Sequence, residues 1–255
     1  MKRRTNRGAA AAFVLAVLGA CLVASPAKAY RPFDGTDADV AALGEFELEA
    51  GAHYTRSEGT TLALPATVLN LGILPEVEAV VDFAPVVSFD APPGAAPFGV
   101  FGTDFFLKWV FRRGSLQGEP GPSLALETGP LLPELHGDAR FGYQASVLGS
   151  ERGRALAVHL NALAALSRLG HPSAGGSLIL EGIPASALRP VTELFASATR
   201  GEGTVISVLA GAVWTLGGSL ALDGAGRVGR DDHRSFAEVR LGVTFAFPVW
   251  IPGHP

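Results

Sequence analysis

The sequence predicts an all-β protein, a transmembrane antiparallel up-and-down β-barrel of about twelve strands preceded by a cleaved signal peptide. The first observation behind this prediction is strict alternation in residues 235–247. There, apolar residues such as Val239 and Leu241 are separated by polar ones such as Glu238 and Arg240. A pattern with period two indicates a β-strand with one apolar face. This strand is long enough for the roughly 9–11 residues that cross a bilayer at a tilt.

The second observation is the composition. Hydrophobic residues make up 48% of the chain, and charged residues only 17%. A soluble domain usually has about 25% charged residues. A chain this apolar, with no obvious membrane-spanning helix, favours a barrel, because barrel strands distribute apolar residues by alternation rather than in continuous runs.

The third observation is an uncharged run, residues 203–222, which reaches the length of a membrane-spanning helix. Gly217-Gly218 interrupts it between two strand-length pieces, as in a β-hairpin turn. A helix would have to accommodate both glycines at a cost of roughly 1 kcal/mol each relative to alanine. The run therefore predicts a hairpin.

The N-terminus has the features of a targeting segment. Basic residues between positions 2 and 7 precede the apolar residues 9–23 and the small-x-small sequence Ala27-Lys28-Ala29. We therefore expect residues 1–29 to be a signal peptide cleaved after Ala29. A competing interpretation is a lipobox, in which Cys21 becomes a lipidated N-terminus. Both routes lead out of the cytoplasm, and together with the barrel they predict the cell outer membrane.

The charge and the cysteine content exclude several classes of partner and site. The expected leader holds five basic residues and no acid, so its removal lowers the formal net charge from −4 to −9. An acidic protein is a poor partner for nucleic acid. Cys21 is the only cysteine, so the processed chain has no disulfide and no thiolate site.

The remaining chain divides into three parts. Residues 30–43 are rich in proline, glycine and short polar residues, and we expect an irregular periplasmic lead-in. The barrel is expected over residues 44–247, and a short tail over 248–255, because Pro248 cannot donate to a strand ladder. The expected strands are 44–55, 61–71, 77–89, 103–113, 122–129, 139–149, 154–167, 175–182, 190–200, 203–215, 218–227 and 235–247.

The connections between these strands alternate in length. Bacterial barrels have short turns at the periplasmic side and longer loops outside. Residues 72–76, 150–153 and 216–217 fit the short set, whereas 90–102, 131–138 and 228–234 fit the long set. Residues 114–121 break the rule because they form a long connection in the short set.

The polar faces of the expected strands carry many charges, with acids in excess. We interpret them as lining the lumen, either as a conduction path or binding lumen that favours cations or neutral polar solutes, or as a salt-bridge network that fills a narrow barrel. Closure of the barrel is expected to bring Arg240 to one of the acids of the first strand. The candidate lumen residues are Glu45, Glu47, Glu49, Glu78, Asp82, Asp104, Lys108, Arg112, Glu127, Arg140, His159, Glu181, Glu193, Asp223, Arg227, Glu238 and Arg240.

The motifs of an enzyme are missing from the sequence. It has no Gly-x-Ser-x-Gly, phosphate loop, dinucleotide fingerprint or His-Glu-x-x-His. His159 with Ser146 is the only pair that would suit a nucleophile and its base, and His159 falls on a polar face. No histidine has metal-ligand spacing, so we expect neither catalysis, metal nor cofactor.

Several short pieces resemble a known family. They are Arg31-Pro32-Phe33-x-x-Thr36-Asp37-Ala38, Glu47-Leu48-Glu49, the segment from Gly72 to Glu78, and Gly102-Thr103-Asp104 followed by Leu107-Lys108-Trp109. Together they are similar to outer-membrane β-barrel transporters of the MetA-pathway of phenol degradation family. The pieces lie in the first half of the chain. The resemblance implies a link to the uptake of aromatic or hydrophobic compounds.

The expected function is a passive outer-membrane pore or transporter for small molecules. The alternatives are a structural or surface-exposed barrel that transports nothing, and a secreted soluble β-barrel that binds a ligand. The expected partners are outer-membrane lipid, the barrel-assembly machinery during insertion, and a small-molecule solute.

Overall fold

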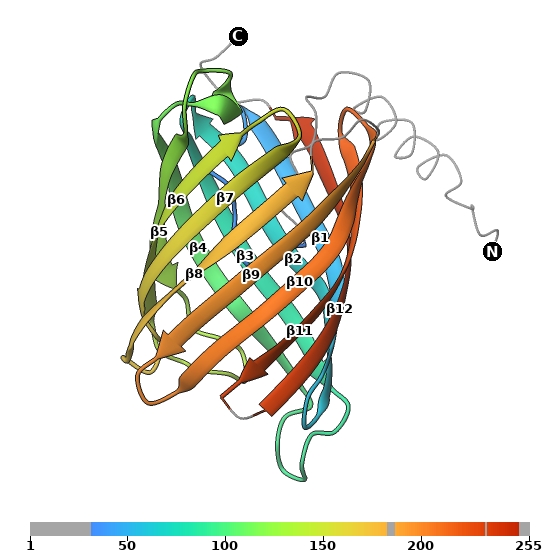
Figure 1. Ribbon diagram of the computed structural model, residues 1–255. Coiled ribbons are helices and arrows are strands. Elements are labelled where there is room, and N and C mark those ends of the chain that lie inside the picture. Colours follow the sequence, from blue (N-terminus) through green and yellow to red (C-terminus); the bar gives the residue numbers. More distant parts are fainter. Residues whose placement is uncertain (1–31, 183–186, 233, 250–255) are drawn as a thin grey trace, which may run out of the picture.

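The chain forms one closed antiparallel barrel in which each strand pairs with the next and β1 pairs with β12 (Figure 1). The computed structural model describes residues 32–182, 187–232 and 234–249. The predicted fold class and the strand count are confirmed. The signal peptide, Cys21 and residues 250–255 of the tail lie outside the described residues. The strands are β1 (Glu45–Arg56), β2 (Thr60–Leu74), β3 (Val77–Ser88), β4 (Phe98–Arg112), β5 (Ser123–Leu131), β6 (Gly142–Arg152), β7 (Leu156–Leu166), β8 (Pro172–Gly182), β9 (Leu188–Thr199), β10 (Gly203–Gly217), β11 (Leu220–Asp231) and β12 (Arg234–Pro248).

The two ends of the barrel differ. We call the end where β1 begins and β12 ends the terminal end, and the opposite end the loop end. As predicted, β10 and β11 form a hairpin, with only Gly218 and Ser219 between them at the terminal end. The β3–β4 connection is long and extends beyond the barrel at the loop end (Figure 1). The prediction of a long connection between β11 and β12 is wrong. Both strands are longer than expected, and only residues 232–233 separate them.

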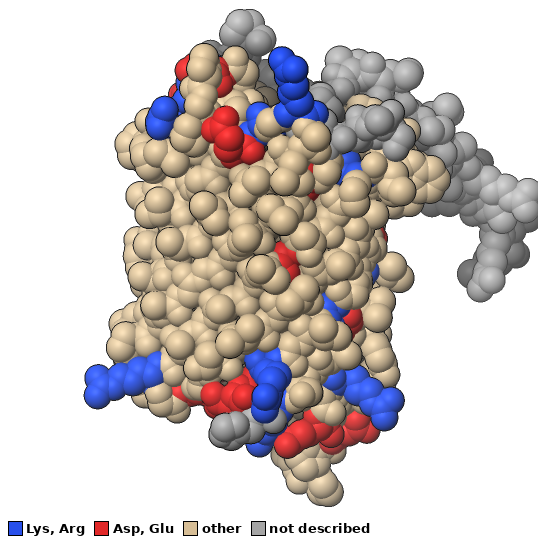
Figure 2. Space-filling view, in the orientation of Figure 1, with Lys and Arg blue, Asp and Glu red and all other residues tan. Residues whose placement is uncertain are grey.

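The outer face of the barrel is apolar. Leu241 is 60% exposed and Val239 53% exposed, although both belong to a regular strand. Figure 2 shows that charged side chains gather at the two ends of the visible face and are sparse between them. Large aromatic residues such as Trp109, Trp214 and Tyr143 are also exposed. An apolar band of this kind matches the hydrocarbon region of a bilayer. Within the described ranges, no helix is long and apolar enough to cross a membrane.

The inner face takes the alternate residues of the same strands. Arg240 is only 3% exposed and Thr244 is fully buried, so the polar face of β12 points inward as predicted. Near the terminal end, some inward residues are apolar instead. Val110, Ala125 and Leu148 form a small core inside the barrel.

The segment before β1 completes that core. Ala38 and Val40 pack against the three wall residues. We call residues 32–41 the plug, because their hydrogen bonds reach side chains on β3, β6, β7, β9 and β12. The structure therefore corrects the expectation of a periplasmic lead-in. The segment is irregular, but it lies inside the barrel, where its apolar residues are buried and its backbone N–H groups find acceptors.

The long β4–β5 connection also belongs to this arrangement. It contains a short 3₁₀ helix, Ser115–Gln117, whose Leu116 is buried. Gln117 donates hydrogen bonds to the carbonyl oxygen of Ala38 and to Asp39 Oδ1, both at 3.0 Å. The connection is long for its end of the barrel because it folds over the plug and holds it there.

Candidate functional site: a plugged lumen

Two arginines of the wall hold the first part of the plug. Arg240 donates to the carbonyl oxygen of Pro32 at 2.6 Å and to Asp34 Oδ1 at 2.7 Å. Arg227, on the neighbouring strand β11, forms an ion pair with Asp34 at 2.8 Å. Glu238 binds both arginines from the wall side. Charge-assisted bonds of this kind are the stronger class of hydrogen bonds in proteins, so Asp34 anchors the plug to β11 and β12.

Phe33 adds an apolar contact beside this anchor. It packs against Val191, Val213 and Ala221, which are inward residues of β9, β10 and β11. The plug is therefore held on this wall by charge and by apolar burial together.

Lys108 holds the middle of the plug from the opposite wall. Its side chain is 1% exposed and lies 3.4 Å from Glu78 Oε1. It also donates to Thr36 Oγ1 at 3.1 Å and lies 3.9 Å from Asp37. Glu78 in turn accepts the backbone N–H of Ala41 at 2.6 Å. A buried lysine requires such compensation, because an ammonium group away from water is costly unless it is paired.

Further wall side chains accept the backbone N–H groups of the plug. Glu193 accepts those of Asp34 and Gly35, each at 2.8 Å. Asn161 accepts the N–H of Thr36 at 2.9 Å and returns a bond to its carbonyl oxygen at 2.8 Å. Gly35 suits this place because a Cβ there would collide with the hydroxyl of Ser177. Glycine therefore lets the backbone approach the wall closely while Ser177 keeps its side chain.

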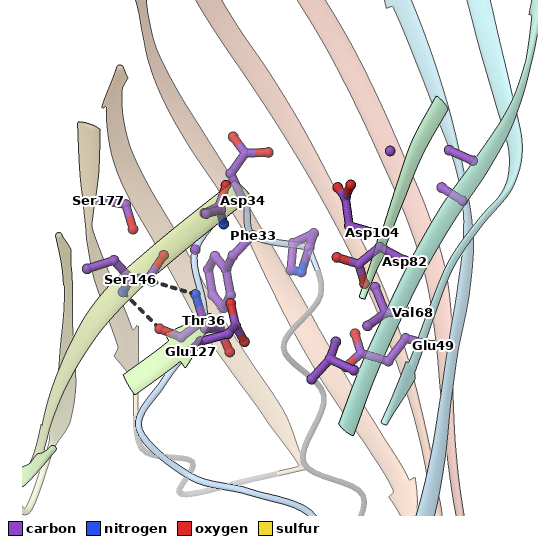
Figure 3. Close-up of a pocket in the computed structure, with 18 of the residues that line it drawn as sticks. Phe33, Asp34, Thr36, Glu49, Val68, Asp82, Asp104, Glu127, Ser146 and Ser177 are labelled. Carbon is purple, nitrogen blue, oxygen red and sulfur yellow. Dashed lines mark hydrogen bonds between the residues drawn. The ribbon is translucent and has the colours of Figure 1, made fainter. Parts of the chain in front are cut away.

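The lumen beside the plug contains a cavity of about 470 Å³. Figure 3 shows Phe33, Asp34 and Thr36 of the plug facing it, with Glu49, Asp82 and Asp104 on the wall across from them. Asp82 on β3 lies directly opposite Asp104 on β4. Arg168, from the β7–β8 connection at the loop end, binds Asp104 at 2.6 Å and Glu134 at 3.2 Å. The cavity is thus acidic on one wall and contains apolar side chains as well.

A group of polar residues around His159 lies in the wall near the terminal end. His159 Nδ1 is 2.9 Å from Ser150 Oγ, and its Nε2 is 3.7 Å from Glu181 Oε2. Arg189 binds Glu181 on the other side. His159 is not paired with Ser146, the one serine that the sequence offered for it, because the β6–β7 register places Ser150 opposite the histidine. Ser150 Oγ also accepts the N–H of Ala38 at 2.9 Å, so this group is another attachment of the plug.

Most of the predicted lumen residues point inward. Glu49, Glu78, Lys108, Asp82, Asp104 and Glu127 gather on β1, β3, β4 and β5, and Arg227, Glu238 and Arg240 gather on β11 and β12. Glu193, His159 and Glu181 lie between these groups, and Glu45, Glu47 and Asp223 are buried nearer the terminal end. Arg240 does not meet an acid of β1, because the register places His53 opposite it and Thr55 opposite Glu238.

Two predicted lumen residues lie outside the lumen. Arg112 is exposed, because a bulge after Val110 shifts the register and sets Arg112 beside Leu124 on the outer face. Arg140 precedes β6 and is exposed in a connection at the loop end. There, the hydrogen bonds that it donates to Asp138 hold the pKa of that carboxyl below its usual value.

Several residues of the lumen were not predicted, because they lie outside the regular strands or at the very start of one. Asp34, Thr36 and Asp37 belong to the plug, and Arg168 and Arg189 lie in or near connections. One signal was present in the sequence. A lumen with this many charges needs counter-ions, and the irregular lead-in contains three aspartates outside any expected strand.

Comparisons with known proteins support the fold. No family model matches the sequence, and no curated protein matches it. The crystal structure of an outer membrane channel from Pseudomonas putida F1 is similar, with a TM-score of 0.63 and 12% identity over 84% of this chain and 100% of that chain. The NanC porin has a TM-score of 0.55 and 9% identity over 78% of this chain and 98% of its own. The KdgM porin has a TM-score of 0.51 and 12% identity over 78% and 99%. At these identities the similarity shows a shared barrel fold alone.

Within the described ranges, no group of three or more histidine, cysteine, aspartate or glutamate side chains is arranged to hold a metal ion.

Proposed function

We propose that this protein is an outer-membrane channel for small molecules, with a lumen narrowed by its own N-terminal plug. The observation that carries the proposal is the combination of an apolar outer face with a charged inner face around a cavity of about 470 Å³. A barrel with lipid outside and hydrated charges inside provides a polar route across a membrane.

The outer face weighs against the soluble alternative. Side chains such as Leu160, Ile206 and Leu241 are between 58% and 60% exposed. A soluble barrel would cover side chains of this kind or replace them with polar ones, because large exposed apolar patches cause association. The non-transporting barrel remains the competing function, since the plug and its ion pairs fill part of the lumen.

The residues that carry the family resemblance support a closer relation to the MetA-pathway of phenol degradation family. They are scattered in the sequence, yet several of them meet in the lumen, whereas Trp109 lies on the outer face. Phe33, Thr36 and Asp37 lie in the plug, while Glu78 and Lys108 bind it from the wall. The structurally similar channels have the same barrel fold, which is consistent with this relation. We propose a small molecule, aromatic or hydrophobic in part, as the solute.

We further propose that the barrel has no enzymatic activity. Ser150 and His159 are each 2% exposed, and the serine oxygen already accepts the N–H of Ala38. A nucleophile must be reached by its substrate, and the plug covers this one.

Solute flux into proteoliposomes tests the channel function. The purified protein is reconstituted, folding is verified by heat-modifiable gel migration, and the swelling rate is measured with uncharged solutes of increasing size. We expect flux that falls to the protein-free value as solute size increases. Flux equal to the protein-free value for every solute would favour the non-transporting barrel.

A further inference from the structure

We propose that the lumen cavity binds small organic cations and that Asp82 holds the ammonium group. This inference deepens the proposed channel function by naming a class of solute, and it rests on that function only for the route to the cavity. It starts from a carboxylate that the described residues leave unsatisfied.

Asp82 is placed where a negative charge is costly. It lies directly opposite Asp104 in the β3–β4 ladder, and like charges in opposite positions destabilise a strand pair. Figure 3 shows the two carboxyl groups side by side at the cavity. Asp82 Oδ1 is buried and accepts no hydrogen bond from any described residue. A buried acceptor without a partner costs free energy. Asp82 also lines the cavity, and a cation bound at the cavity side of this carboxyl group would offset part of the cost of its charge.

Among the described residues, no side chain forms an ion pair with Asp82 that would supply this cation. Asp104 lies opposite it in the ladder, and Glu49 and Glu127 line the same cavity. Two basic residues near it, Lys108 on β4 and Arg168 in the β7–β8 connection, are engaged elsewhere. Lys108 binds Glu78 and the plug, and Arg168 binds Asp104 and Glu134. Asp82 is therefore left without a cationic partner among the described residues.

The volume and the lining of the cavity favour an organic cation over an inorganic one. Its volume of about 470 Å³ falls within the roughly 300–1,000 Å³ of small-molecule sites. Val68, Val80 and Phe83 lie on the same wall as Asp82, and Phe33 and Phe195 also line the cavity. Aromatic faces attract ammonium groups, and apolar walls bind a hydrocarbon body. An inorganic ion would use the carboxylate and leave these side chains without a role.

Equilibrium dialysis of the full barrel in detergent tests the site without relying on conduction. The probe is benzylamine at neutral pH, where it is the benzylammonium cation, and benzyl alcohol is the uncharged match. A protein-free micelle sample corrects for partitioning. The variant is Asp82→Asn, which keeps the shape and removes the charge. The matched control is Asp223→Asn, the same change in the same lumen on β11, outside the cavity wall.

We expect benzylammonium to bind more tightly than benzyl alcohol. Asp82→Asn should weaken its binding about tenfold or more, as for loss of a charged hydrogen bond, while Asp223→Asn leaves it unchanged. Equal binding of the two probes, or equal effects of the two variants, would overturn the proposal and leave Asp82 as a protonated carboxyl only. A barrel that binds the cation but passes no solute would contradict the channel function and leave the site intact.

Discussion

At the scale of single residues, the lumen is organised by charges that satisfy one another across long sequence distances. Arg240 shows this best, because it binds Pro32 and Asp34 of the plug and Glu238 of its own strand. Removing one partner of a buried ion pair leaves the others uncompensated, which costs more than the pair itself contributes. The stability of the plugged barrel should therefore depend strongly on this side chain.

Arg240→Gln should destabilise the barrel by about 3 kcal/mol. The reason is that Asp34 and Glu238 would lose a buried cationic partner. Urea unfolding in detergent, followed by tryptophan fluorescence, measures the change. Arg230→Gln is the matched control, because Arg230 is exposed on the adjacent strand β11. Equal midpoints for the two variants would show that the Arg240 network contributes nothing to stability.

The sequence predicted these charges on the polar faces, but not their partners. Alternation shows which face a residue occupies, and Glu238 and Arg240 follow it. Partners depend on register and on the irregular segment, and Arg240 and Pro32 are 208 residues apart. The bulge that turns Arg112 outward interrupts the alternation locally. Phe195 did not fit the pattern expected for its strand, yet it lines the cavity and lies under Arg227 at 5.7 Å.

At the scale of elements, the strands were predictable and the plug was not. Each strand has one apolar face because lipid requires it, and this produces the period-two signal. The plug has no repeat, because its residues bind the wall one at a time. Pro32, Gly35 and short polar residues are also typical of an exposed linker. The position of this segment is therefore the part of the fold that most needs a direct test.

A disulfide tests the position of the plug. In Gly35→Cys/Ser177→Cys, the new Cβ at position 35 lies against the side chain at position 177, so we expect a bridge to form on mild oxidation of the folded barrel. Cys21 is the only cysteine of the natural sequence, so thiol labelling and mass spectrometry report this pair. The control is Gly35→Cys/Ser173→Cys, because position 173 lies four residues away on β8, roughly 13 Å along the strand. Free thiols in the first variant would contradict a plug inside the lumen.

A substitution on the closing strand β12 tests whether the outer face contacts lipid. Leu241→Arg would place a charge among apolar side chains, and we expect a cost of about 2–4 kcal/mol in a bilayer if the residue faces its centre. Folding in lipid vesicles across a denaturant series measures it. Leu135→Arg, in the exposed β5–β6 connection, should change stability little. If the two substitutions cost the same, the exposed face of β12 does not contact lipid.

At the scale of the whole molecule, the barrel combines three layers. The outer band meets lipid, the wall closes without a free edge, and the lumen holds the plug with an acidic cavity beside it. The terminal end is the more closed one, because the plug, the small apolar core and the β4–β5 connection meet there. A solute that reaches the cavity would have the plug on one side and the acidic wall on the other. The molecule as a whole should therefore pass ions slowly and prefer cations.

Electrical recording from the protein in planar lipid bilayers under a salt gradient tests this central claim most directly. We predict small, resolvable conductance steps and a reversal potential of the sign expected for cation preference. A membrane that stays sealed at all voltages, although gel migration shows a folded barrel, would contradict the account.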